Sequence, residues 1–144
     1  MNERVRVGEH EVWYEPDSGL VHEVLNGPLS MPDMLALSEW ATKWANDANP
    51  HAAFYLIDIR NTTVMSARLR TEFRRNISKM PRVANGKSYV ATFGGTFPAR
   101  VTASMVFKGV ELATKRVFAR ALVDEAEART WLAQRMRAEL DERH

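Results

Sequence analysis

Cysteine is missing from this chain of 144 residues, which excludes disulfide bonds, thiol nucleophiles and thiolate metal sites. Long apolar runs are missing too, and no segment approaches the length of a membrane span. The first residues, Met1 to Val7, alternate charge with valine and lack the apolar stretch of a signal peptide. We therefore expect a cytoplasmic protein with no transmembrane segment.

A strong charge of either sign is also missing, since the formal net charge is only +2. That excess is too small to indicate a nucleic-acid partner. The histidines are scattered and show no metal-ligand spacing: they are His10, His22, His51 and His144. An apolar fraction of 45% and this length predict one globular domain, residues 1–144, and the scattered histidines predict no metal site.

The most informative stretch is a short apolar run from Ala52 to Ile59, which only Asp58 interrupts. It is rich in β-branched and aromatic residues and shows no alternation, as in a strand that is buried on both faces. A polar turn over residues 60–63 and a helix cap at Ser66 are expected to follow. Open α/β sheets usually place their working surface at such strand ends.

The remaining pattern predicts a β-β-α-β-α-β-α-β-α order, with about five strands and four helices. The expected strands are 5–15, 20–26, 52–59, 88–93 and 116–123, and the expected helices are 30–47, 66–80, 97–114 and one from 124 onward. Strands that alternate with helices predict an α/β fold, with a largely parallel sheet and a hairpin at its start.

Four segments resemble the STAS/SpoIIAA-like family: the strand Leu56–Asn61, the helix that starts eight residues after Asp58, the Gly94-Gly95 pair after a strand, and Val117–Leu132. The resemblance covers roughly residues 10–140. It implies a mixed sheet packed by helices that acts as a binding module, without a cofactor and not as an enzyme. Members include anti-sigma-factor antagonists, sulfate-transporter tails and small bacterial proteins of unassigned role, and a related group is similar to lipid-binding CRAL-TRIO domains.

One family motif is replaced. Antagonists carry Asp-Ser-Ser-Gly at this helix start and are phosphorylated on the first serine, whereas here Ser66, Ala67, Arg68 and Leu69 occupy those places. Ser66 lies one position early, so the usual phosphorylated serine has no counterpart.

The first functional hypothesis is a regulatory interaction module whose partner is a protein or an anionic surface. Its predicted binding surface consists of Asp58, Asn61, Ser66, Arg68, Arg70, Arg74 and Arg75. Nucleic acid is not expected, because no aromatic residue that could stack on bases faces outward with the arginines. The alternative for the arginines is a solvated helix face, for Ser66 a helix cap, and for Asp58 hydrogen bonds within its own loop.

Two further hypotheses belong to other classes. One is a carrier of a small apolar or lipid-like ligand, held beneath the helix Phe97–Leu112, and the remote one is a hydrolase that uses Asp58 and Ser66. Gly94, Gly95 and Thr96 before that helix are interpreted either as an anion-binding or ligand-binding loop or as a plain turn.

The helix Phe97–Leu112 has more apolar residues than one sheet-facing stripe requires. Met105 or Phe107 is therefore expected to be partly exposed. Either a second copy of the chain covers this surface in a homodimer, or the C-terminal helix covers it through Trp131 and Met136.

Overall fold

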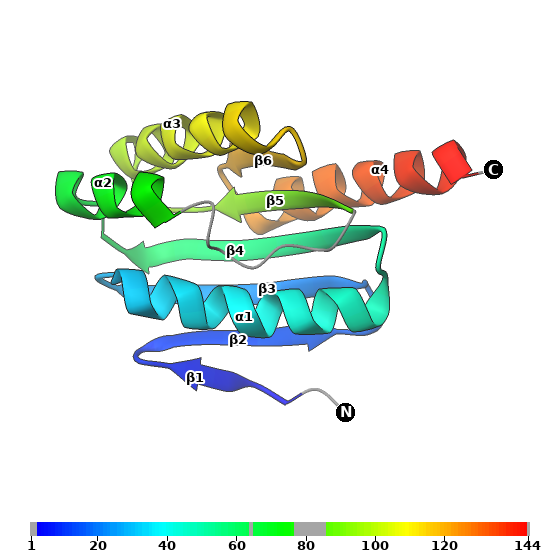
Figure 1. Cartoon of the computed structure of the whole chain (residues 1–144), viewed down its shortest axis with the longest axis horizontal. Helices are drawn as coiled ribbons and strands as arrows, with labels where there is room; N and C mark the ends of the chain where they lie inside the picture. The colour runs from blue at the N-terminus through cyan, green and yellow to red at the C-terminus, as the bar shows by residue number, and fades with distance from the viewer. Residues whose placement is uncertain (1–2, 64, 77–85, 144) are drawn as a thin grey trace.

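A computed structural model of the chain describes residues 3–63, 65–76 and 86–143. The elements alternate as the sequence predicts, and the α/β fold class is confirmed (Figure 1). In chain order they are β1 (Val5–Val7), β2 (His10–Glu15), β3 (Leu20–Gly27), α1 (Met31–Ala48), β4 (Ala52–Thr62), α2 (Ala67–Asn76), β5 (Lys87–Phe93), α3 (Phe97–Thr114), β6 (Val117–Leu122) and α4 (Glu125–Arg143).

The strands form one mixed sheet in the order β1-β2-β3-β4-β5-β6. In the N-terminal part of the sheet, β2 pairs antiparallel with β1 on one side and with β3 on the other. From β3 to β6 all pairs are parallel, as expected where helices connect successive strands.

The N-terminal hairpin differs from the prediction of one strand over residues 5–15. Gly8 adopts a φ of 60°, a conformation that glycine reaches without steric cost, and the chain reverses there. Val7 then pairs with His10 across the turn. The described part of the chain therefore contains six strands, one more than the sequence predicted.

The apolar run is confirmed as an inner, buried strand, since β4 pairs with β3 on one side and β5 on the other. It is longer than predicted, however, and continues through the expected polar turn to Thr62. Asn61 pairs with Asn26, and the Thr62 hydroxyl donates to the Gly27 carbonyl at 2.8 Å. These contacts with β3 hold the polar residues in an extended conformation.

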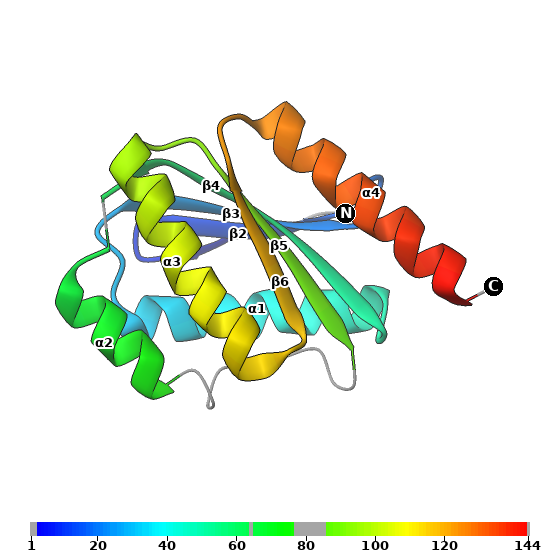
Figure 2. The same ribbon diagram turned by 90° about the horizontal axis from the view of Figure 1, so that it is seen from above.

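The two faces of the sheet are covered unequally, as Figure 2 shows: α1, α2 and α3 lie on one face and α4 lies on the other. On the α4 face, Ala128 and Leu132 are fully buried against Leu56 and its neighbours. On the other face, Leu37 and Ala41 of α1 pack in one cluster with the strands. Alternate residues of each strand therefore belong to different cores.

Hydroxyl side chains cap the starts of α1 and α3. The Ser30 hydroxyl accepts from the Asp33 amide, and the Thr96 hydroxyl accepts from the Ala99 amide, both at 3.2 Å. The predicted end of the second helix, residues 77–80, and the turn predicted at Pro81 and Asn85 lie outside the described residues. In the described ranges, none of the helices has both the length and the apolar composition needed to cross a membrane.

Candidate ligand-binding site

A cavity of about 330 Å³ lies between the sheet and the helices α1, α2 and α3. Its floor comes from alternate residues of β3, β4 and β5, which share a face because side chains alternate along a strand. Leu25, Tyr55 and Ile57 are examples. The roof consists of apolar side chains of the three helices, including Leu69 and Phe107. The cavity is thus an apolar enclosure built on the inner strands.

Glu23 of β3 is the one charged residue among the described residues that line this cavity. It pairs in register with Val12 of β2 and Ile57 of β4, so it sits in the interior of the sheet. Burial raises the pKa of its carboxyl from 4.5 to about 7. No opposite charge contributes to that shift, so Glu23 combines an enclosed position with a titration point near neutrality.

Tyr55 of β4 lies beside this carboxyl group. Burial raises the pKa of its phenol well above the ordinary value, and the negative charge of Glu23 raises it further. Its hydroxyl forms hydrogen bonds with Thr42 of α1 and Ser88 of β5, which lower the pKa but do not offset the increase. The phenol therefore stays protonated, and the cavity carries hydrogen-bonding groups next to its single acid.

The sequence did not single out Glu23 or Tyr55. A signal was present, because the inner strand β3 carries His22 and Glu23 in succession within an apolar segment. Successive residues of a strand point to opposite faces, so one of the two had to enter each core. Whether His22 or Glu23 lines a cavity depends on how the helices cover the two faces of the sheet.

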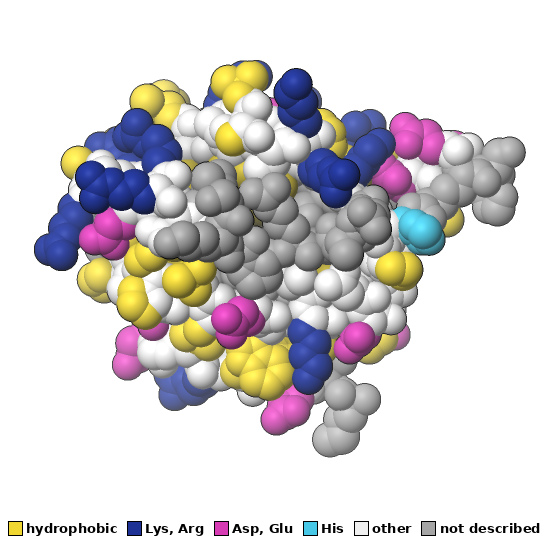
Figure 3. Space-filling model, viewed as in Figure 1, with side chains coloured by type: hydrophobic (Ala, Val, Ile, Leu, Met, Phe, Trp, Pro, Cys, Tyr) yellow, Lys and Arg dark blue, Asp and Glu magenta, His cyan; other side chains and the backbone are white. Residues whose placement is uncertain are grey.

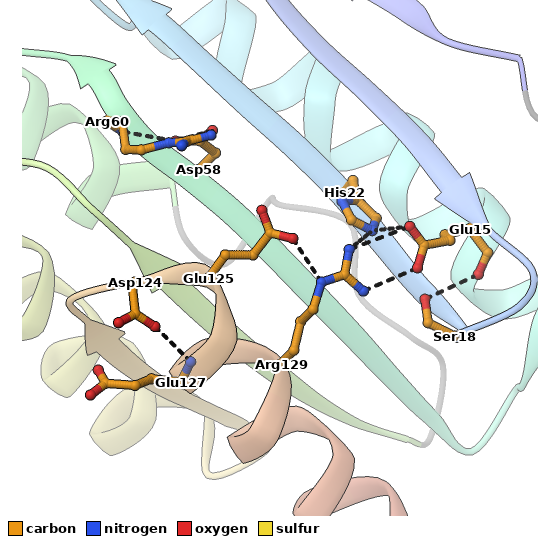
Figure 4. Close-up of polar contacts among 9 residues, drawn as sticks. All are labelled: Glu15, Ser18, His22, Asp58, Arg60, Asp124, Glu125, Glu127 and Arg129. Atoms are coloured by element: carbon orange, nitrogen blue, oxygen red, sulfur yellow. Dashed lines mark hydrogen bonds and ion pairs between the residues drawn. The ribbon is translucent and has the colours of Figure 1, made fainter.

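Asp58 lies on the α4 face of the sheet, away from the cavity. Figure 4 shows its carboxylate facing the side chain of Arg60. It accepts from the Arg60 backbone amide at 2.9 Å and from the guanidinium at 2.7 Å. This confirms the interpretation that Asp58 accepts hydrogen bonds from its own segment.

The predicted binding surface is split by the sheet. Ser66 caps α2, where its hydroxyl accepts from the Leu69 amide at 3.1 Å. Because α2 covers the face opposite α4, the structure does not bring Ser66 and Asp58 together. Asn61 is exposed near the C-terminal end of β4.

The arginines of α2 do share a surface, which we call the basic patch: Arg68, Arg70, Arg74 and Arg75. Arg68 is 90% exposed and pairs with Glu72 at 3.1 Å, while Arg74 and Arg75 are exposed and Arg70 is half-buried. Figure 3 shows these basic side chains gathered over α2.

Gly94 and Gly95 form the turn between β5 and α3, both with positive φ. A Cβ at Gly94 would lie 2.2 Å from Cγ of Arg60, so this position has no room for a side chain. The Gly94 amide donates to the carbonyls of Leu122 and Val123, and Thr96 is occupied as the cap of α3. These contacts support the interpretation of Gly94, Gly95 and Thr96 as a plain turn.

The α3 helix is exposed along one apolar stripe, formed by Phe97, Val101, Met105 and Leu112. Met105 is 65% exposed, as predicted, whereas Phe107 points inward and lines the cavity. The expectation that the C-terminal helix covers this surface is wrong, because α4 lies across the sheet and its Trp131 packs in the opposite core.

A second polar cluster joins α4 to the first hairpin (Figure 4). Arg129 donates to Glu15 at 3.1 Å and to Glu125 at 2.8 Å, and Nε2 of His22 lies 3.0 Å from Glu15. Arg129 is the main cause that lowers the pKa of Glu15 to about 2, and burial lowers the pKa of His22. Every charged group here has a partner, which is typical of a structural network. Among the described residues, no group of three or more His, Asp or Glu is placed to hold a metal ion.

Comparisons with known proteins add little. No family model and no curated protein matches the chain. One similar solved structure is an uncharacterized protein from the DUF3478 family, with a SpoIIAA-like fold, from Shewanella loihica PV-4. It shares 17% identity over 92% of each chain, with a TM-score of 0.47. Its described fold agrees with the family that the sequence resembles, but a likeness of this strength carries no argument about the site.

Proposed function

We propose that this protein binds a small, largely apolar ligand in the cavity between the sheet and helices α1, α2 and α3. The observation that supports this most is the cavity itself, about 330 Å³ in volume, with apolar walls and one enclosed carboxyl group. Small-molecule sites share these properties and range from about 300 to 1,000 Å³.

The free energy gained by burying a hydrocarbon chain in this cavity is of the size needed for reversible binding. Burial of a hydrocarbon contributes about 0.8 kcal/mol per CH₂, so an octyl chain gains about 6 kcal/mol before the cost of association. Without that cost the gain would correspond to a dissociation constant between micromolar and millimolar, so the net affinity is weaker than this limit. The described helices line the cavity mainly with apolar residues, such as Leu69 and Phe73 of α2 and Val106 of α3.

A cavity-filling substitution tests the proposal. Ala103 of α3 lines the cavity, while Ala113 of the same helix is exposed and lies away from it. We expect Ala103→Trp to weaken binding of the neutral fluorophore N-phenylnaphthylamine by at least tenfold. Ala113→Trp is the matched control and should bind like the unmodified chain. Equal binding by both variants, with unchanged circular dichroism, would contradict a ligand in this cavity.

A second candidate function is the interaction module, acting through the basic patch on α2. Its support is the exposure of Arg74 and Arg75 and of the Arg68 side chain. An anionic protein or lipid surface is the partner that this charge favours. Both functions are compatible, since α2 uses Leu69 and Phe73 for the cavity and its arginines face elsewhere.

A further inference from the structure

Glu23 determines the electrostatic character of the cavity. The groups that face it come from four other elements: Val12 of β2, Tyr55 and Ile57 of β4, and the lining residues of α1 and α3. Of the described lining residues, Tyr55 is the only other one that titrates, and none is a base. The carboxyl group thus meets a largely apolar space in which the described residues supply no counter-charge.

Each class of ligand has a different consequence for this group. An anionic ligand would be repelled by the carboxylate, and a neutral apolar ligand would exclude water and leave the charge unsolvated. A cation inside the same enclosure would pair with the carboxylate where the local dielectric is low, and charge-assisted hydrogen bonds are the strong ones. Only the last class turns the enclosed acid into a favourable contact.

We propose that the ligand is an apolar amine, a hydrocarbon body with one protonated nitrogen, whose ammonium group pairs with the Glu23 carboxylate. This inference rests on the proposed ligand-binding function and specifies its chemistry. An ammonium group has several N–H donors for the Glu23 carboxylate, and the polar hydroxyl of Tyr55 lies next to that carboxylate. The apolar walls then accommodate the hydrocarbon.

The pH dependence follows from the titration of Glu23. Its pKa is about 7 in the unoccupied cavity, whereas an alkylamine, like lysine, keeps its proton up to about pH 10. Amine affinity should therefore be constant between about pH 8 and 9. Below the pKa of Glu23 it should fall by about tenfold per pH unit, because the carboxyl group must lose its proton to pair.

Three probes with one hydrocarbon chain separate the possibilities: octylamine, octanol and octanoate, each measured by calorimetry at pH 8 below its micelle concentration. We expect octylamine to bind at least tenfold more tightly than octanol, and octanoate more weakly than both. In Glu23→Gln the preference for octylamine over octanol should disappear while octanol binding persists.

The outcomes distinguish the two proposals. If octanol binds and octylamine binds no more tightly, the amine inference is wrong and the ligand-binding function stands. The same conclusion follows if octylamine still binds more tightly than octanol in Glu23→Gln. If none of the three binds, the proposed function fails and the inference with it. The unmodified chain supplies a check that needs no variant: the ratio of octylamine to octanol affinity must rise from pH 6 to pH 8, and a constant ratio would overturn the inference.

Discussion

Arg129 of α4 lies 3.1 Å from the carboxylate of Glu15 on β2, although 114 residues separate them in the chain. This contact fastens the C-terminal helix to the first hairpin, at the edge of the sheet that lies farthest from β6. It is half-buried, and the same guanidinium also holds Glu125 of its own helix.

We expect Arg129→Met to lower the free energy of unfolding by about 1 kcal/mol at pH 7, after allowance for solvent screening. The pKa of Glu15 is 4.5 when unfolded and about 2 when folded. Its contribution is therefore present above about pH 4.5 and is lost as the pH falls toward 2. The difference between the two proteins should shrink over that range in urea titrations.

The matched control for this contact is Arg137→Met, an exposed arginine on the same helix. Surface substitutions of this kind change stability by less than about 0.5 kcal/mol. If both variants lose the same stability at every pH, the contact does not fasten α4.

Glu23 predicts the opposite pH dependence. Its pKa is higher in the folded chain, about 7, than the ordinary 4.5, so stability falls as the pH rises from about 4.5 through 7. Glu23→Gln should then be more stable than the unmodified chain by about 3 kcal/mol at pH 8, and nearly equal to it at pH 4. Thermal or urea unfolding at the two pH values measures this.

Glu39→Gln on the exposed side of α1 serves as the control, because it removes one carboxylate that is not enclosed. It should leave the pH profile of the unmodified chain unchanged. A parallel profile for Glu23→Gln and Glu39→Gln would show that Glu23 titrates like a surface acid.

The basic patch predicts binding that depends on salt. Reversal of its exposed members, Arg68, Arg74 and Arg75, to Glu should leave the fold intact, because these side chains lie off the buried Leu69 and Phe73. Binding to phosphatidylglycerol vesicles should be lost in this variant. In the unmodified chain, binding should weaken strongly above about 0.15 M salt, where exposed charges are screened beyond about 8 Å.

A control with the same change in net charge carries Glu at the exposed Arg4, Arg6 and Arg137. It should retain vesicle binding if the position of the charge matters. Loss of binding in both variants would show that net charge alone causes the binding. Binding that changes neither with charge reversal nor with salt would show that the basic patch is not the binding surface.

The apolar stripe on α3 predicts self-association. We expect a dimer in sedimentation experiments at micromolar concentration, and a monomer for Met105→Asp. Each large apolar side chain buried between copies contributes about 1.5–3 kcal/mol before the cost of association. Ser104→Asp, at the exposed neighbouring position, should remain dimeric.

Phe107 is unsuitable for this test, because it lines the cavity and a carboxylate there would disturb binding and folding together. An unmodified chain that sediments as a monomer at all concentrations would show that the stripe does not mediate a dimer.

Local features of the structure were predictable from the sequence. The apolar run of β4 and the helix cap at Ser66 depend on contacts between near neighbours, and each lies where the sequence places it. The split at Gly8 was missed, because one glycine in an alternating segment does not reveal a reversal of the chain.

Features that depend on a face of the sheet were less predictable. Asp58 precedes α2 closely in sequence, and the prediction grouped them on one surface. Side chains alternate with a period of two, however, and the pairing of β4 with β3 directs Asp58 to the α4 face. The sequence did not show that Glu23 and Tyr55 line the cavity for the same reason, since the cavity arises only when three helices cover one face.

The unequal covering of the sheet has a consequence for how this protein can change over evolution. The α4 face, centred on the buried residues Leu56, Ala128 and Leu132, contributes stability without lining the cavity. The cavity face can therefore accept substitutions that reshape ligand preference while the opposite layer keeps the chain folded. Divergent relatives should then differ most in the side chains of α2 and α3 that face the cavity, and least in the layer beneath α4.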